Sequence, residues 1–590
     1  MKKIIFFLAI LCTWTVTSCD DVLDTKPGDT YSEADIYSDT DLADRLLLYS
    51  YNCTDTWGEN LNNFWCRCTG TENVCDEAFF HWKTTRYSLY RVTAGQLTPN
   101  DLGNAFTNLW KDVYSYIRSC DEFLTNIKDS DAMKKDPDKT NQLIAEARFL
   151  RAYCYNKLIR QFGGVPLFDK PFKMDDELNV PRNSYEECVD FIVSELDAAA
   201  AVLPEYNKGN DFGRADKRAC LALKSRVLLY AASKLHDPST QPSGPLYDYD
   251  KASKWQDAAD AAKAVIDLPT CQDGLIQVTD AKAYQELFLH PNVNILFARP
   301  FNSSYATFDT QIYTLPDKAQ SPCGYNGWGL SDPTQNMVDA FRMNNGKAIT
   351  DPNSGYDENK RYENRDLRFY ANILYNGTAF RGRKVEFFEY GKDGLNSILN
   401  PDMCKHYNKT GYCMRKFQDE TIDFDVEMSA DRPYISFRLA EMYMNYAEAM
   451  YHLGSEEVAR KYASKVAQRA HQPAITSSGE ELLNDIKNEC QIEFCFEGHR
   501  YYDLRRWMDV AHLSGDIRGI KCAYVDASGN EVELSYDAEE NVIVPVGATL
   551  KYTAIPKLEN RPWTVAYYYL PIPYSEIEKA DKLEQNYGYD

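Results

Sequence analysis

The sequence has no apolar run long enough to cross a bilayer, for which a helix needs about 20 consecutive apolar residues. Its N-terminal apolar stretch covers only residues 4–11, and no later stretch resembles a transmembrane helix. Positive charge is also scarce: 65 Lys and Arg stand against 88 Asp and Glu, and no long basic run occurs. This balance argues against binding of nucleic acid or an anionic lipid surface.

Motifs of enzyme chemistry are missing as well. There is no H-E-x-x-H, G-x-S-x-G, Walker loop or G-x-G-x-x-G, and the eight histidines are scattered singly. Among 88 acids a glycosidase pair of carboxylates can still arise by chance. We therefore predict no catalytic residues, while a glycoside hydrolase remains a minor alternative.

Cysteine is too sparse for a disulfide scaffold, with 17 in 590 residues. Many of them fall in helical patterns and are expected to be small buried residues. Cys404 and Cys413 flank a predicted turn, NKTG at 408–411, and either bridge each other or stay reduced. Cys53, Cys66, Cys68 and Cys75 lie near His81, but their spacing matches no standard zinc site, so we predict no metal and no cofactor.

The N-terminus has the order of an export signal. Lys2 and Lys3 precede the apolar stretch, and VTSC at 16–19 is followed by acids. We predict a signal peptide at 1–18, lipidation of Cys19 and a lipidated tether at 19–40; an ordinary signal peptide with cleavage elsewhere is the alternative. Val16 stands where many lipidation sites have Leu. Removal of residues 1–18 takes away two lysines and changes the net charge from −23 to −25.

Helical patterns dominate two stretches, about 100–270 and 437–510. Residues 141–162 place apolar side chains three and four apart and end at Gly163-Gly164. Ser184 and Glu187 predict a capping box at the start of the next helix. Residues 437–470 predict a helix, a turn at Gly454 and a second helix, with small residues alternating with tyrosines as in tetratricopeptide hairpins.

Two other stretches, about 271–436 and 511–575, are rich in Gly, Pro, Asn and Tyr. They contain short strand-like runs such as residues 542–544 and 565–569. We predict a mainly α fold for residues 41–590, in which stacked helical pairs carry loop-rich, short-strand lobes. Loops on a rigid frame are where binding residues collect.

Several motifs occur in a fixed order along the chain. They are AEARFLRAY at 145–153, FGGVPL at 162–167, PRNS at 181–184, GRADK at 213–217, DPTQ at 332–335, RDLRF at 365–369, IKNECQIEFCFEGHRYYDLRRW at 486–507, LPIP at 570–573 and QNYGY at 585–589. As a set they resemble the RagB/SusD family of Bacteroidota outer-membrane lipoproteins.

The resemblance implies a SusD-like fold and a cell-surface protein that is not an enzyme. It implies an oligosaccharide ligand and a SusC-type TonB-dependent transporter as the partner in the outer membrane; some relatives handle peptides instead. The motifs are mostly architectural. We expect the charged and aromatic side chains of residues 500–507, Trp507 included, to pair within the fold.

Candidate ligand residues are aromatic side chains, which stack on sugar faces, and polar ones, which bond to sugar hydroxyls. Trp328 is the first candidate, with Tyr325 beside it in a glycine-flanked loop whose backbone we expect to approach the ligand. Residues 56–91 supply further candidates: Trp65, Trp82, Asn63 and Arg67. Phe79, Phe80, Trp110, Trp255 and Trp507 are expected in the core.

Overall fold

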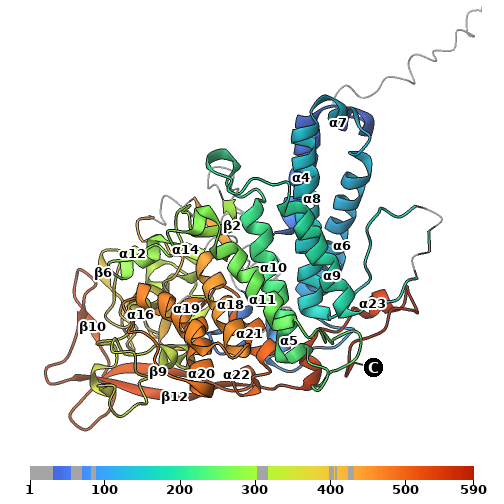
Figure 1. The fold of residues 1–590 in the computed structure, drawn as a ribbon. Coiled ribbons are helices and arrows are strands. Elements are labelled where there is room, and N and C mark those ends of the chain that lie inside the picture. The colour runs from blue at the N-terminus through green and yellow to red at the C-terminus, as the bar shows by residue number, and fades with distance from the viewer. Residues whose placement is uncertain are drawn as a thin grey trace, which may run out of the picture.

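A computed structural model of the chain describes residues 31–54, 70–81, 88–173, 176–177, 179–301, 316–397, 404, 408–422 and 431–589. Long helices form one side of the molecule, and short strands and loops form the other, ending in a two-stranded ribbon (Figure 1). None of the helices within the described ranges is long and apolar enough to cross a membrane.

The main helices follow one another as packed neighbours. They are α4 (Thr40–Ser50), α6 (Gly103–Asn126), α8 (Pro137–Phe162), α9 (Tyr185–Ala200), α10 (Lys217–Ala232), α11 (Lys254–Ile266), α18 (Leu439–His452), α19 (Glu456–Arg469), α20 (Gly479–Glu493) and α21 (Arg500–Trp507). Each of α8, α9, α10 and α11 contacts the next in the chain, and α11 contacts α18, which pairs with α19. The predicted stack of helical pairs is confirmed, and the chain turns at Leu453-Gly454 between α18 and α19 as expected.

Shorter helices connect these pairs. They are α3 (Glu33–Ile36, within the predicted tether), α5 (Ser88–Thr93), α7 (Asp131–Lys135), α12 (Ala281–Glu286), α14 (Pro316–Gln320), α15 (Gln335–Ala340), α16 (Leu367–Asn372), α22 (Val510–Leu513) and α23 (Tyr574–Ile577).

Helix boundaries follow the predicted signals. The α8 helix begins at Pro137 after the Asp136 cap and ends at Gly163, whose φ of +75° favours glycine. A side chain at Gly163 would also collide with the carbonyl of Leu246. At α9 the Ser184 hydroxyl accepts from the Glu187 N–H (3.1 Å), and the Glu187 carboxylate accepts from the Ser184 N–H (2.8 Å), which is the predicted capping box.

The strands pair two by two, always antiparallel. The pairs are β1 (Ala78–Phe79) with β3 (Asp332–Pro333), β2 (Ile295–Phe301) with β8 (Arg432–Arg438), β4 (Ile373–Tyr375) with β7 (Tyr412–Met414), β5 (Ala379–Phe380) with β6 (Arg383–Lys384), β9 (Gly515–Val525) with β12 (Thr549–Arg561), and β10 (Ser535–Tyr536) with β11 (Val542–Ile543). The long β9–β12 ribbon projects at the lower left in Figure 1.

Two local predictions are wrong. Residues 565–568 form a 3-10 turn instead of a strand, because Tyr567 and Tyr568 are both buried and do not alternate between two faces. Cys404 bonds to Cys323, with a Cα–Cα distance of 5.3 Å, and Cys413 is a free, buried thiol. The strand that carries Cys413 pairs with β4, which turns this cysteine away from Cys404 and into the cluster around Leu374.

The charged block at residues 500–507 lies inside the fold, as expected. Arg500 donates to both oxygens of Asp76 (2.9 and 2.8 Å), and Arg506 donates to both oxygens of Glu448 (2.6 and 2.7 Å). The Trp507 indole N–H also donates to Glu448 (2.7 Å). These charged side chains therefore pair within the helical scaffold, which is called the frame below, and they do not form a ligand surface.

Candidate ligand-binding site

Two segments far apart in the sequence meet next to the predicted aromatic loop. The pairing of β1 with β3 places Phe79 opposite Asp332. The Asn73 amide donates to the Ser331 hydroxyl (2.8 Å), which donates to Glu72 (3.0 Å). The two regions that the sequence suggested separately, around 56–91 and 325–329, therefore have a common base.

Asp332 joins a third segment to this base. Its buried carboxylate accepts a hydrogen bond from the Lys409 backbone N–H (3.1 Å), and the His81 imidazole lies 3.9 Å away. Burial raises the pKa of the Asp332 carboxyl well above its usual range. His81 and the backbone at Lys409 thus lie against Asp332, next to the Trp328 loop.

Trp328 rests on a rigid support. Its backbone N–H donates to the Lys318 carbonyl (2.9 Å), and its half-buried ring packs on the Cys323–Cys404 disulfide. Because the disulfide and the hydrogen bond fix the loop, the indole would lose little conformational freedom when a ligand binds. This is the geometry that a stacking residue needs.

Tyr325 supports this loop. Its hydroxyl donates to the Phe380 carbonyl (2.7 Å), and the Arg383 guanidinium lies 3.8 Å from the ring centre, over one face. Arg383 in turn forms a double ion pair with Asp393 (2.7 and 2.9 Å). Partial burial raises the pKa of the Tyr325 hydroxyl. One face and the hydroxyl of Tyr325 are therefore already used within the protein.

The glycines of the loop serve its own packing. A side chain at Gly327 would collide with the Ser321 backbone, and one at Gly324 with Lys392 and Asp393. The close backbone approach that the sequence suggested for a ligand is thus made to other parts of the chain.

The other predicted positions divide into two groups. Trp65, Trp82, Asn63 and Arg67 lie outside the described residues. Phe79, Phe80, Trp110 and Trp507 are buried as expected, and Trp255 is half-buried and stacks on His452 with ring centres 3.8 Å apart.

Sequence reasoning missed the supporting residues. Arg383 and Asp393 gave no signal, since their link to Tyr325 spans about 60 residues of loop. Asn326 was part of the aromatic loop but was not singled out. It is exposed, and its φ of +59° is a conformation that asparagine tolerates. Its amide can donate to and accept from sugar hydroxyls beside Trp328.

No group of three His, Cys, Asp or Glu side chains that could hold a metal ion occurs in the described part of the chain. What the site offers is an aromatic ring on a fixed base with polar groups at its edge. Aromatic rings with polar groups at their edge are the kind of surface on which a sugar can stack and form hydrogen bonds.

Comparison with known proteins settles the family. A family model described as SusD family matches residues 294–589, and a second, described as starch-binding associating with outer membrane, matches residues 23–229. The chain belongs to the SusD family. This confirms the resemblance carried by the motifs, and with it a family of carbohydrate-binding proteins that are not enzymes.

Relatives and solved structures agree over most of the length. SusD-like protein P38 of Formosa agariphila is 22% identical over 88% of this chain and 95% of its own. Starch-binding protein SusD of Bacteroides thetaiotaomicron is 25% identical over 62% of this chain and 64% of its own.

Among solved structures, a SusD-like protein from Bacteroides fragilis is 26% identical with a TM-score of 0.75, covering 95% of this chain and 99% of its own. A SusD-like carbohydrate-binding protein from the same species is 23% identical with a TM-score of 0.71, covering 93% of this chain and 100% of its own. The mainly α, SusD-like fold is thereby confirmed.

Proposed function

We propose that this SusD-family protein captures an oligosaccharide at the cell surface and passes it to a SusC-type TonB-dependent transporter. The observation that carries the proposal is the contact between the Trp328 loop and residues 70–81, which belong to the stretch 56–91. Both were chosen from sequence as aromatic-rich candidates, and they share one base although about 250 residues separate them. The names of the starch-binding and carbohydrate-binding relatives support the same ligand class.

A binding screen tests the ligand. The purified chain without its signal peptide is run through native gels that contain plant, host or microbial polysaccharides, and each mixture is then analysed for products. We expect retardation by at least one glycan with no change in that glycan. Release of shorter products would show a hydrolase, and retention only on peptide columns would show peptide capture.

Delivery to a transporter has its own test. The tagged protein is produced in the native host at its natural level. The outer membranes are then solubilised in detergent, and the tagged protein is isolated together with the proteins that it binds. We expect a TonB-dependent transporter to be retained in near-equal amount. If the protein is recovered without a transporter under conditions in which it still binds glycan, delivery to the transporter would be contradicted and glycan capture would not.

Anchoring at the surface rests on the VTSC–Asp-Asp junction. Several acyl chains on Cys19 would bind the membrane firmly, at about 0.8 kcal/mol per buried methylene. Cys19→Ala should therefore move the protein from the membrane to the soluble fraction, while Cys53→Ala should leave it in place. A fully membrane-bound Cys19→Ala protein would contradict lipidation.

A further inference from the structure

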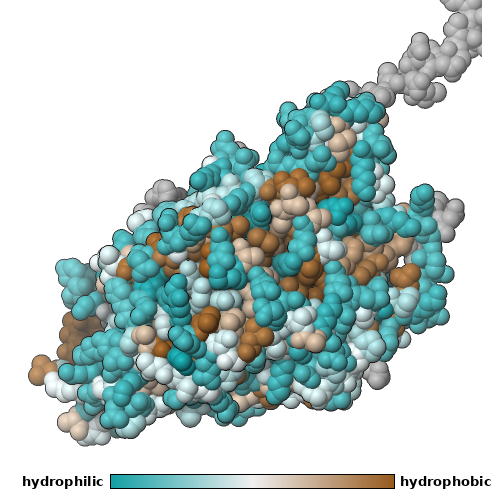
Figure 2. Space-filling model, in the orientation of Figure 1, coloured by the Kyte–Doolittle hydropathy of each residue, from teal (hydrophilic) through white to brown (hydrophobic). Residues whose placement is uncertain are grey.

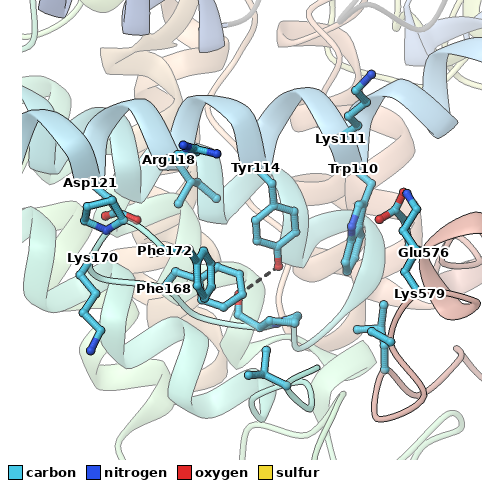
Figure 3. A pocket seen from close by; sticks show the side chains of 16 residues that line it. Trp110, Lys111, Tyr114, Arg118, Asp121, Phe168, Lys170, Phe172, Glu576 and Lys579 are labelled. Atoms are coloured by element: carbon cyan, nitrogen blue, oxygen red, sulfur yellow. Dashed lines mark hydrogen bonds and ion pairs between the residues drawn. The ribbon is translucent and has the colours of Figure 1, made fainter. Parts of the chain in front are cut away.

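A second hollow lies on the helical side of the molecule, away from the Trp328 loop. Its volume is about 480 Å³, within the range of small-molecule pockets. Three segments enclose it: the middle of α6, the chain from Pro166 to Phe172 that follows α8, and the C-terminal segment around Ala580 (Figure 3). In Figure 2 hydrophobic side chains gather near the right edge of the molecule, where α9 and α23 lie in Figure 1.

Aromatic rings form the walls and are fixed before any ligand arrives. Trp110 packs edge-on against Phe162 with ring centres 5.1 Å apart, and Phe168 packs in the same way on Phe172 at 4.5 Å. The Tyr114 hydroxyl donates to the Pro166 carbonyl (2.9 Å), which ties the loop to α6. The pocket is therefore pre-formed, and an apolar ligand would lose little free energy to reorganisation.

Two polar groups between the aromatic walls, Tyr114 and Asp121, are already paired. Tyr114 uses its hydroxyl as described, and buried Asp121 accepts from Arg151 (2.5 Å). A sugar placed here would lose water from its hydroxyls without finding new partners, at a cost of about 1–3 kcal/mol for each group. The walls instead favour a ligand whose body is apolar.

Positive charge surrounds this apolar space. Lys111, Arg118, Lys170 and Lys579 line it, against only Asp121 and Glu576. Asp121 pairs with Arg151, Lys579 with Glu576 (2.8 Å) and Arg118 with Glu122 (2.8 Å), so the excess of positive charge rests on Lys111 and Lys170. Lys111 and Lys170 form no ion pair with any residue that the structure describes. In a chain with a net charge of −23, this local excess of cations favours an anionic ligand.

We propose that this pocket binds an organic carboxylate with an apolar body, aromatic or alkyl. The body packs between Trp110, Tyr114 and Phe172, and the carboxylate stays at the rim, where it pairs with the flexible side chain of Lys170; in Figure 3 Lys111 points away from the rings. The site is separate from the Trp328 loop, so it does not depend on the glycan proposal.

Calorimetry with phenylbutyrate and decanoate tests the proposal and separates the aromatic from the alkyl source. Phenylbutanol and decanol are the neutral controls. We expect at least one carboxylate to bind about tenfold more tightly than its alcohol, because a charged acceptor strengthens the bond to lysine. Equal binding of acid and alcohol, or no binding of either acid, would overturn it.

Variants locate the site. Ala580→Phe fills the pocket and should abolish binding of the carboxylate. If Ala580→Phe does not fold, Val180→Phe, which narrows the same pocket, is used instead. Lys111→Gln/Lys170→Gln should remove most of the preference for acid over alcohol, whereas Lys128→Gln/Lys134→Gln on the exposed surface should not. Trp328→Ala should bind the carboxylate like the parent. Carboxylate binding that survives both filling variants, or that a bound glycan displaces, would refute a separate site.

Discussion

The block at residues 486–507 and the loop at residues 321–334 use the same kinds of side chain for opposite purposes. In the first, Arg506 and Trp507 donate to Glu448, a buried residue of the neighbouring helix α18. In the second, Trp328 is half-buried and packs on both the main core and the Cys323–Cys404 disulfide. The motifs that identify the family therefore mostly build the frame. One of them, DPTQ at 332–335, ends this loop and anchors it through Asp332, whereas Trp328 lies outside every motif.

The difference also concerns charge. Arg368 at the frame's centre contacts Asp366, Glu489 and Glu493 in complete burial. In the loop region Asp332 accepts from the Lys409 N–H and Asp393 forms a double ion pair with Arg383, and both carboxylates fix loops. A frame built on buried ion pairs is sensitive to loss of one partner, whereas the loop surface is sensitive to loss of ring area.

The largest expected effect is therefore in the frame. Glu448→Ala removes the carboxylate acceptor of the Trp507 N–H and of both terminal nitrogens of the buried Arg506 guanidinium, which keeps only Asp503 (2.8 Å) as an ion-pair partner among the described residues. Loss of one partner of a buried ion pair typically costs about 3–5 kcal/mol. Denaturant unfolding should show a lower midpoint with binding lost only as the protein unfolds. Glu457→Ala, at an exposed position in the first turn of α19, is the matched control and should change the midpoint little. An unchanged Glu448→Ala midpoint would show that this buried network does not hold the frame together.

The next prediction compares the two regions through the same change, tryptophan to alanine, at Trp328 in the loop and at Trp507 in the frame. Trp328→Ala should weaken glycan binding by about 2 kcal/mol, roughly thirtyfold, because a desolvated stacking ring carries more of the affinity than rim hydrogen bonds. Its circular dichroism and unfolding midpoint should match the parent.

Trp507→Ala is the counterpart in the frame. It should lower the unfolding free energy by about 3–5 kcal/mol and leave the affinity of the folded fraction unchanged. If Trp328→Ala binds as tightly as the parent, the ligand lies elsewhere, and the next positions to test are Tyr375 and Tyr305, of which Tyr305 lies outside the described residues.

The frame could be predicted well from sequence because its signals are local. The 141–162 periodicity, the Ser184–Glu187 capping box and the turn at Gly454 each depend on residues within one or two helical turns. The internal pairing of residues 500–507 also followed, since so many charges beside aromatic residues in one helix need partners.

The loops could not be predicted in the same way because their contacts are long-range. Cys404 pairs with Cys323 across 81 residues, and nothing local favours that partner over Cys413. The role of Tyr325 depends on a carbonyl 55 residues away, at Phe380. The strand-like run at 565–569 failed because tertiary burial of consecutive tyrosines overrode strand propensity.

Acid should act on the frame through His236. This buried imidazole donates to the Tyr247 carbonyl (2.7 Å) and stacks on Tyr185, and burial lowers its pKa to about 3. Between about pH 6.5 and pH 3 the unfolded chain binds a proton that the folded chain refuses, so stability falls as pH falls, by about 1.4 kcal/mol per pH unit for one such group.

Replacing the imidazole tests this. His236→Asn keeps a donor for Tyr247 but cannot titrate, so its unfolding free energy should fall less steeply below pH 6.5 than that of the parent. Equal slopes for the two proteins would show that His236 is protonated in the folded state.

The smallest expected effect concerns metal ions at the loop surface. Three carboxylates of the described loop region are engaged: Asp332 with the Lys409 N–H, Asp393 with Arg383, and Asp317 with Arg432. A calcium ion needs six to eight oxygen ligands, several of them carboxylate, and these groups are not available to it. Glycan binding should therefore be the same before and after treatment with a chelator, measured on the same gels as the parent and Trp328→Ala. A large loss that calcium restores would mean that the loop surface, unlike the frame, is shaped by an ion whose ligands lie on other residues.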